Sequence, residues 1–452
     1  MINFYRIITI VLSVISIIAV LLTKAYIPSN LVLIPLIFLC LFLIFPSFSR
    51  YIFKNIGITV INFTMLIRYA ISPLLMSLYG SNIHLGSSIS MSIQSKAINL
   101  MLYEMIMIFI TFAIFYKRFY SNKKNFKNIK STSNLFGWIF VIITLLIVIL
   151  IPNTISTYSF IWSTKQLNND VLTNISGFVT LVQLGQLVLT ISILNVIYKL
   201  HSKKNNIFYL ILSIIVILTS ASFINGTSRF SIILPLVTGF FTIFILYKNY
   251  RKIIAFFSMI LILVFIVMST LLKHQTNISS HNVGFWKGLN TDLQVYFAGV
   301  ANIGHAIETS YIYMPFNIKA ILGDLSHSVM IINSYFSDYQ SALVLFNNMF
   351  YKQLGFRDQI LPLLGQGYLY FGWILAPLFS VIMILLTMFL DRLIYNSSSI
   401  FVLYIYTYLC LKWSLFFMSN ATILISFFTN FVLILLIIAF LNEKILIRKD
   451  NK

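Results

Sequence analysis

Long runs of apolar residues separated by short polar stretches dominate the chain. A bilayer core about 30 Å thick needs about 20 apolar residues of helix to cross it, so runs of that length predict transmembrane helices. The first run is expected to be a transmembrane helix and not a cleaved signal peptide, because no small-residue cleavage site precedes Lys24. We predict an all-helical integral membrane protein with about 12 transmembrane helices. The predicted ranges are 5–23, 31–49, 56–80, 97–116, 135–152, 175–198, 207–224, 230–247, 253–272, 367–390, 400–418 and 423–440.

Lys and Arg residues concentrate in alternate connections between these predicted helices. One set of connections, together with both chain ends, holds 20 of the cations, and the opposite set holds nine. Loops rich in Lys and Arg stay in the cytoplasm. Both termini are therefore predicted to be cytoplasmic, in a multi-pass membrane protein.

Composition supports the membrane assignment and restricts the function. Hydrophobic residues make up 59% of the chain and charged residues 9%, and the mean hydropathy is +0.94, which excludes a soluble enzyme. The net charge of +21 would suggest nucleic acid in a soluble protein, but here most cations lie on the predicted cytoplasmic side. They are expected to orient the protein and to contact anionic membrane lipids. No nucleic-acid partner is predicted.

One connection is much longer than the others. Residues 273–366 separate the ninth and tenth predicted helices on the external side, and loops of that length are usually functional or disordered. Residues 291–311 and 317–335 carry apolar residues at steps of three and four, which predicts amphipathic helices. We expect two or three helices that lie on the outer membrane face or cap the bundle, although the stripes could also pack on the bundle without touching a substrate. The predicted division is 1–272 (helices 1–9), 273–366 (external loop), 367–440 (helices 10–12) and 441–452 (cytoplasmic tail).

Three ionisable side chains fall inside predicted transmembrane helices: Arg68, Glu104 and Lys412. Such a residue costs about 2.5–3.5 kcal/mol at a helix centre even on lenient insertion scales, so each needs a partner or a wet cavity. The depths of Arg68 and Glu104 permit an ion pair between them. Such a pair could bind substrate, or it could simply lock two helices together.

Two arginines on the predicted external side are candidates for anion binding. Arg229 ends a short turn that also contains Ser228, at the start of the eighth predicted helix. Helix N-termini and guanidinium groups both favour phosphate; the alternative is a plain interfacial arginine. Arg357 is followed by closely spaced glycines at the entry to the tenth helix, but the adjacent Asp358 could neutralise it.

The external loop also contains two histidine–carboxylate pairs at a spacing of three residues. His305 with Glu308, and Asp324 with His327, would each share one face of a helix. A carboxylate that orients an imidazole makes a general base able to deprotonate a sugar hydroxyl, although such pairs also arise by chance on solvated helices. Neither a metal nor a cofactor is predicted: two ligands do not make a metal site, and Cys40 and Cys410 both lie inside apolar runs.

The sequence lacks the characteristic motifs of several enzyme classes. The sequence contains no Asp-x-Asp, Walker, Gly-x-Ser-x-Gly, His-Glu-x-x-His or dinucleotide-binding motif. A processive synthase of the cytoplasmic type is therefore not expected.

The topology, together with Asn225-Gly-Thr-Ser-Arg229 and Gly365-Gln-Gly-Tyr-Leu-Tyr-Phe-Gly372, resembles the Wzy-type polymerases of bacterial O-antigen and capsular polysaccharide. The resemblance implies a metal-independent, GT-C-like membrane glycosyltransferase. It would transfer a growing glycan from a polyprenyl pyrophosphate to a new lipid-linked repeat unit on the outer face. The chain departs from the fixed Arg-to-Gly spacing of some members, since nine residues separate Arg229 from Gly239.

The resemblance assigns roles to the candidate residues as a hypothesis. Outward-facing arginines near glycines in the family correspond here to Arg229 and Arg357, which would bind the donor pyrophosphate, with Ser228, Lys412 and Arg68 as further candidates. A histidine or carboxylate of the external loop would activate the acceptor. The substrate partner would be lipid-linked oligosaccharide, and a flippase and a chain-length regulator are candidate protein partners.

Two alternatives have similar topology. A flippase of lipid-linked oligosaccharide also has about twelve helices, but it is built from two related halves with short loops, and no repeat is visible between the halves here. An O-antigen-ligase-like transferase would differ only in its acceptor. The long external loop favours an enzyme over the flippase.

Overall fold

The computed structural model forms two compact units that divide the chain differently from the predicted membrane topology. Unit 1 contains Met1–Lys123, Asn282–Arg392 and Lys412–Ser426; unit 2 contains Lys124–His281, Leu393–Leu411 and Phe427–Lys452. The residues that the structure describes are 2–23, 27–80, 86–120, 126, 129, 134–160, 169–225, 229–261, 264, 285–312, 318–326, 328–329, 341–352 and 359–450.

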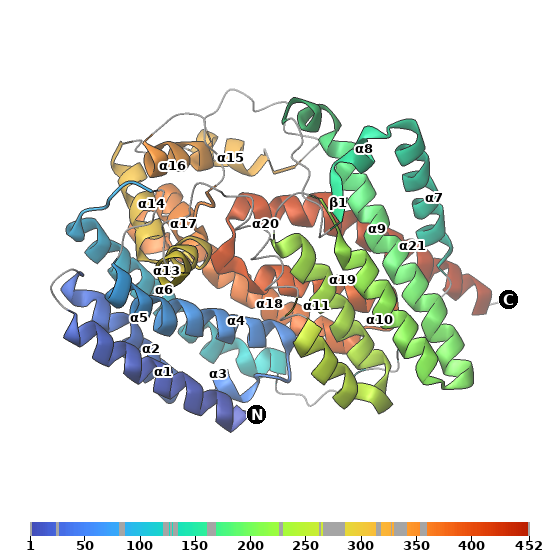
Figure 1. Cartoon of the computed structure of the whole chain (residues 1–452), viewed down its shortest axis with the longest axis horizontal. Coiled ribbons are helices and arrows are strands. Elements are labelled where there is room, and N and C mark those ends of the chain that lie inside the picture. The colour runs from blue at the N-terminus through green and yellow to red at the C-terminus, as the bar shows by residue number, and fades with distance from the viewer. Residues whose placement is uncertain are drawn as a thin grey trace. The chain divides into compact units, whose positions relative to one another are not determined.

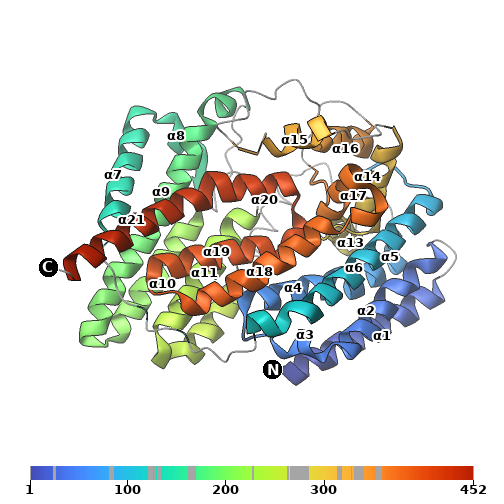
Figure 2. The ribbon, with the colours of Figure 1, turned by 180° about the vertical axis from the view of Figure 1, so that it is seen from behind.

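Unit 1 is a bundle of helices drawn from both ends of its sequence. Within it, α1 packs on α2, and α2 packs on α6, so the three run side by side (Figures 1 and 2). A π-helical turn, η3, lies between α4 and α5, which together with it form the long helix Ile56–Tyr79. The elements are α1 (Ile2–Leu22), η2 (Ser29–Val32), α2 (Leu33–Ile44), α3 (Pro46–Arg50), α4 (Ile56–Leu66), η3 (Ile67–Ile71), α5 (Ser72–Tyr79), α6 (Met91–Tyr120), α13 (Phe285–Tyr296), α14 (Val300–Ile312), α15 (Ile318–Ser326), α16 (Ala342–Tyr351), α17 (Leu363–Leu375), most of α18 (Leu378–Asn396), η7 (Phe416–Met418) and most of α20 (Ala421–Phe427).

Unit 2 is a second helical bundle with one small strand pair. In it α9 packs against α7 and α10, and α10 packs against α11. The side chain of Asn442 accepts a hydrogen bond from the Phe136 backbone N–H at 3.0 Å, which ties α21 to the start of α7. β1 pairs antiparallel with β2. The elements are α7 (Leu135–Leu150), α8 (Asn153–Ser156), β1 (Tyr158–Phe160), α9 (Asn169–Lys204), α10 (Ile207–Ser222), β2 (Phe223–Asn225), α11 (Arg229–Leu246), η4 (Lys248–Tyr250), most of α19 (Ile400–Ser414), η8 (Phe428–Val432) and α21 (Leu433–Asp450).

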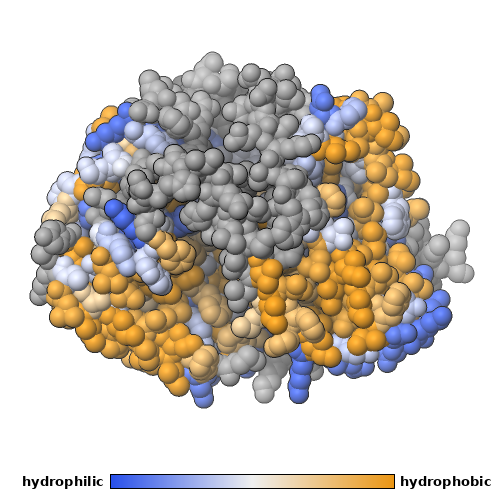
Figure 3. All heavy atoms as spheres, in the orientation of Figure 1, coloured by the Kyte–Doolittle hydropathy of each residue, from blue (hydrophilic) through white to orange (hydrophobic). Residues whose placement is uncertain are grey.

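Long apolar helices indicate a membrane-embedded protein. Six helices of the described residues are long and apolar enough to cross a bilayer: Ile2–Leu22, Ile56–Tyr79, Met91–Tyr120, Gly177–Lys204, Leu378–Asn396 and Ala421–Glu443. A seventh span would be the pair Ser231–Leu246 and Lys248–Leu261, which is bent by 108°. Apolar side chains cover the exposed faces of α1 and α7 (Figure 3). Continuous exposed apolar surface of this kind marks contact with a membrane or a partner.

The twelve predicted ranges all contain helix, but fewer than twelve meet the length of a complete span. Ser29–Ile44, Leu135–Leu150, Ile207–Ser222 and Ile400–Ser414 are apolar helices of only 10–17 residues. Of the ninth predicted range, the structure describes residues 253–261 and 264. The prediction of all-helical architecture is therefore confirmed apart from the three-residue strands β1 and β2, whereas the count of twelve spans and the GT-C-like fold stay predictions.

The tenth predicted span begins later than expected. Inside α17 the backbone of Gly372 has φ 70° and ψ −166°, which breaks the helix. Gly367 lies so close to the carbonyl of Ala376 that an added Cβ would be 2.1 Å from its oxygen, so the chain folds back on itself at Gly372. Glycine permits both the positive φ and the close approach. The helix of this region that is long and apolar enough to cross a bilayer is Leu378–Asn396, whereas the predicted range is 367–390.

The predicted external loop forms four helices in its described part, α13 to α16, where two or three were expected. The predicted stripe over 291–311 is split between α13 and α14 at a turn in which Ala298 has φ 50° and the Gly299 N–H donates to the Gln294 carbonyl. Helix α13 packs on α5, while α14 packs on α6, α16 and α17. These helices are thus part of unit 1 and not a separate domain.

A buried carboxylate joins three helices of unit 1. Asp391 of α18 is 1% exposed and accepts hydrogen bonds from the backbone N–H groups of Gly57 (2.9 Å) and Ile58 (3.1 Å). It also accepts from the Tyr120 hydroxyl of α6 at 2.8 Å. The first N–H groups of a helix have no partner within the helix, and they favour a negative charge. Asp391 therefore anchors the start of α4 to α6 and α18.

We expect Asp391→Ala to lower the stability of the protein in detergent. Leaving buried donors without an acceptor costs about 1–3 kcal/mol, and more where the acceptor was charged. Thermal unfolding of the purified variant measures this loss. Tyr120→Phe, which removes one donor and leaves the carboxylate bonded to α4, should cost less. Equal melting temperatures for Asp391→Ala and the unmodified protein would contradict the anchoring role.

Candidate functional site

His305 and Glu308 contact each other on α14, as their spacing predicted. The imidazole Nδ1 lies 3.3 Å from the Glu308 carboxylate Oε2, and the two side chains are 1% and 17% exposed. Residues three apart in sequence share one face of a helix. The carboxylate therefore borders a histidine that is completely removed from solvent.

The His305 ring is enclosed by α16 and by residues 86–90, which precede α6. The ring centroid lies 4.9 Å from that of Phe350, and a Cβ added to Gly86 would be 3.3 Å from His305 Nε2. Among the described residues neither ring nitrogen has a hydrogen-bond partner. A buried imidazole with unused hydrogen-bonding capacity is unusual in a purely structural role.

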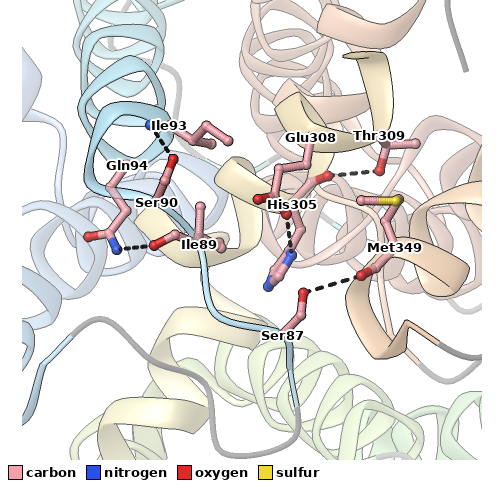
Figure 4. A network of polar contacts seen from close by, with 9 residues as sticks. All are labelled: Ser87, Ile89, Ser90, Ile93, Gln94, His305, Glu308, Thr309 and Met349. Atoms are coloured by element: carbon pink, nitrogen blue, oxygen red, sulfur yellow. Dashed lines mark hydrogen bonds and ion pairs between the residues drawn. The ribbon is translucent and has the colours of Figure 1, made fainter. Parts of the chain in front are cut away.

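The 86–90 segment is held over His305 by bonds at both ends. Ser87 donates to the end of α16, from its N–H to the Phe350 carbonyl (2.8 Å) and from its hydroxyl to the Met349 carbonyl (3.3 Å). At the other end, the Gln94 amide donates to the Ile89 carbonyl at 3.0 Å. Figure 4 shows His305 and Glu308 beside this segment. Access to the imidazole from this side requires the segment to move.

Asp324, the third predicted catalytic residue, has structural partners. Its Oδ2 accepts from the backbone N–H of Ala342, the first residue of α16, at 2.8 Å and from the Tyr370 hydroxyl at 2.5 Å. The side chain is buried at 4% exposure. Asp324 thus joins α15 to α16 and α17. Its predicted partner His327 lies outside the described residues.

Gln366 and Tyr370 extend this network into α20, which the sequence did not reveal. The Gln366 amide donates to the Tyr370 hydroxyl (2.9 Å), and its oxygen accepts from the Ala421 N–H at the start of α20 (2.7 Å). Gln366 stands between Gly365 and Gly367 in the motif that carries the resemblance, where only the glycines were given a role. The signal available was a glutamine inside an apolar stretch, a residue that needs partners when buried.

The predicted ion pair between Arg68 and Glu104 is present. Arg68 Nη2 lies 2.8 Å from Glu104 Oε2, and both side chains are 1% exposed. Ser380 of α18 donates to the other carboxylate oxygen. Arg68 belongs to the π-helical turn η3, a type of turn frequent at functional sites, and its guanidinium carbon lies 4.4 Å from the centroid of the Phe417 ring.

The contacts of Arg68 hold helices of unit 1 together, while its guanidinium Nε makes no hydrogen bond among the described residues, and its role in substrate binding stays a prediction. A charge buried in an apolar bundle is stable when a close opposite charge and hydrogen bonds compensate it. The carboxylate of Glu104 and the face of the Phe417 ring compensate the guanidinium. Arg68 of η3 therefore contacts both α6, through Glu104, and η7, through Phe417.

The structure locates the remaining predicted cations only in part. Lys412 is half-buried in the last turn of α19. Arg229 is the first residue of α11, as its predicted place at a helix N-terminus requires, but its side chain lies outside the described part of the chain. Ser228 and Arg357 lie outside the described residues. Their predicted roles in binding pyrophosphate stay predictions.

No group of three or more His, Cys, Asp or Glu side chains that could hold a metal occurs among the residues that the structure describes. Searches against protein-family models, curated proteins and solved structures find no match to the chain.

We expect disruption of the buried ion pair to destabilise unit 1 strongly. Glu104→Ala would leave the guanidinium of Arg68 buried without its counter-charge, which costs about 3–5 kcal/mol. The matched control is the double variant Arg68→Met/Glu104→Leu, which removes both charges and retains volume. Thermal unfolding in detergent should place the double variant above Glu104→Ala. A double variant as unstable as Glu104→Ala would show that the pairing of charges is not what stabilises these helices.

Proposed function

We propose that the chain is a metal-independent glycosyltransferase of the bacterial cytoplasmic membrane that polymerises oligosaccharide repeat units carried on polyprenyl pyrophosphate. The reaction takes place on the outer face of the membrane, as in the Wzy-type polymerases that the sequence resembles. The observation that carries the proposal is the His305–Glu308 pair, a buried imidazole oriented by a carboxylate within the predicted external loop.

In this proposal His305 is the general base. With Nδ1 protonated beside the Glu308 carboxylate, 3.3 Å away, the lone pair lies on Nε2 and can take the proton of the acceptor hydroxyl. The hydroxyl oxygen then forms the new bond to the anomeric carbon of the donor glycan. The bond from that carbon to the pyrophosphate oxygen breaks, and polyprenyl pyrophosphate leaves with the electron pair.

The leaving pyrophosphate needs positive charge or N–H donors where its charge develops. Arg229, Ser228, Arg357 and Lys412 are the residues we assign to this task. Arg229 fits best, since it begins α11 and helix N-termini favour phosphate. We assign Arg68 and Asp324 to structure instead, because each is buried and bonded to residues of other helices.

Substrate entry in this scheme requires the 86–90 segment to leave His305. Its closure excludes water from the imidazole, which would protect the glycan from hydrolysis at the same centre. The two bonds of Ser87 to the end of α16 are the contacts that opening must break at that point. Bonds of this kind to backbone carbonyls contribute only about 0.5–1.5 kcal/mol each, so opening them is compatible with turnover.

We expect His305→Ala to abolish polymer formation in cells that depend on this protein. Loss of a general base lowers the rate by about 10²- to 10⁴-fold, and Glu308→Gln should give a smaller loss because the imidazole remains. Gel analysis of surface polysaccharide should show single repeat units in place of long chains. Lys352→Ala, at an exposed residue that follows α16, is the matched control.

The outcomes separate the alternatives when immunoblots and melting curves confirm normal folding. Full-length polymer with His305→Ala contradicts the assignment of the base. In a strain that lacks the protein, long polymer that is not attached identifies a ligase-like transferase, and lipid-linked units held in the inner leaflet identify a flippase. Either result would contradict the polymerase proposal.

A further inference from the structure

Helix α13 begins with exposed aromatic side chains and buries polar side chains further along. Asn290 and Gln294 stand one turn apart and are 1% and 0% exposed. Phe285 and Trp286, at the beginning of the helix, are 71% and 55% exposed, and their rings contact each other with centroids 5.3 Å apart. A helix on the surface of a water-soluble bundle has the opposite arrangement, with the apolar stripe toward the core.

The buried polar side chains of α13 form hydrogen bonds to the last part of the apolar helix Ile56–Tyr79, which consists of α4, η3 and α5. Gln294 donates to the Ser72 hydroxyl at 3.2 Å and accepts from the Ala301 N–H at 3.3 Å. Asn290 donates to the Gly80 carbonyl at 3.0 Å. Gly80 directly follows Ile56–Tyr79, one of the candidate membrane spans. The Asn290 bond fixes one point of α13 where that span ends, and the Gln294 bond to Ser72, eight residues earlier, holds the rest of the helix alongside the span.

The surface beside this junction is apolar as well. Leu78 and Tyr79, the last residues of the span, are 56% and 39% exposed. Aromatic side chains are enriched where a membrane protein passes from hydrocarbon to water, and a basic residue next to them, here Lys287, can extend toward the headgroups. The exposed aromatic pair of α13 therefore continues the lipid-facing end of the span.

We propose that the first turn of α13 lies in the headgroup region of the bilayer, with Phe285 and Trp286 inserted among the lipids. The exposed aromatic pair is an interfacial anchor, and the bonds of Asn290 and Gln294 fix its position relative to α5. Through Gln294, α13 also positions the start of α14, the helix that carries His305. The proposal concerns lipid contact alone and does not depend on glycan transfer.

Fluorescence quenching by spin-labelled lipids tests this placement. A protein in which Trp286 is the only tryptophan, the other four being replaced by phenylalanine, is reconstituted into vesicles of phosphatidylglycerol and phosphatidylcholine. Nitroxides in the headgroup or upper acyl chain should quench Trp286 strongly, and nitroxides at the chain end weakly. A protein that keeps only Trp413, which is 9% exposed, is the control and should be quenched less by every label.

Two results would overturn the proposal. Emission typical of water without quenching would place Trp286 in solvent, and emission typical of an apolar site without quenching would show that protein, such as a second copy, covers it. If the tryptophan replacements unfold the protein, cysteine labelling replaces fluorescence. Trp286→Cys should then react with a membrane-impermeant maleimide several-fold more slowly than Lys287→Cys, and equal rates would contradict lipid insertion.

Discussion

Buried charge must be compensated inside the apolar helices of unit 1, and the ion pair between Arg68 and Glu104 meets this constraint. The two charges lie 2.8 Å apart between side chains that are 1% exposed, in segments otherwise rich in apolar residues. In such surroundings an unpaired charge is costly, so Arg68 and Glu104 stabilise the bundle only in the register that brings them together. The pair links η3 to α6, and the hydroxyl of Ser380 links the same carboxylate to α18.

The need of buried polar groups for partners also explains the other contacts that join distant parts of unit 1. Asp391 satisfies the first N–H groups of α4, Asp324 does so for α16, and Gln366 does so for α20. Each is a buried polar side chain placed where a helix begins and leaves backbone donors without partners. Asp324 joins α15 to α16 and α17, and an apolar core that includes Phe346, Phe350 and Leu369 packs α16 and α17 against α14. His305 lies beside that core, against the ring of Phe350.

The sequence predicted the contacts that follow from local spacing or from a charge without an alternative partner. His305 and Glu308 share a helix face, and Arg68 and Glu104 have few other groups to pair with in their apolar segments. It could not predict partners supplied by distant backbone, such as the N–H groups that bind Asp324 and Asp391. The stripe over 291–311 did not reveal the turn at Ala298 and Gly299 that separates α13 from α14, and the reversal at Gly372 was missed because a glycine in an apolar run does not reveal its φ angle. The candidate cations were recognised from the sequence, but the geometry of Arg229 and Arg357 lies outside the described residues.

The proposed function needs His305 and its helix on the outer side of the membrane. Cysteine accessibility in intact cells tests this most directly, with Lys352→Cys and Lys203→Cys compared in a background that carries Cys40→Ala and Cys410→Ala. Both lysines are exposed; one follows α16 and the other lies in the last turn of α9. The account predicts that a membrane-impermeant maleimide labels Lys352→Cys in intact cells and Lys203→Cys only after permeabilisation. Labelling of Lys352→Cys only after permeabilisation would contradict it.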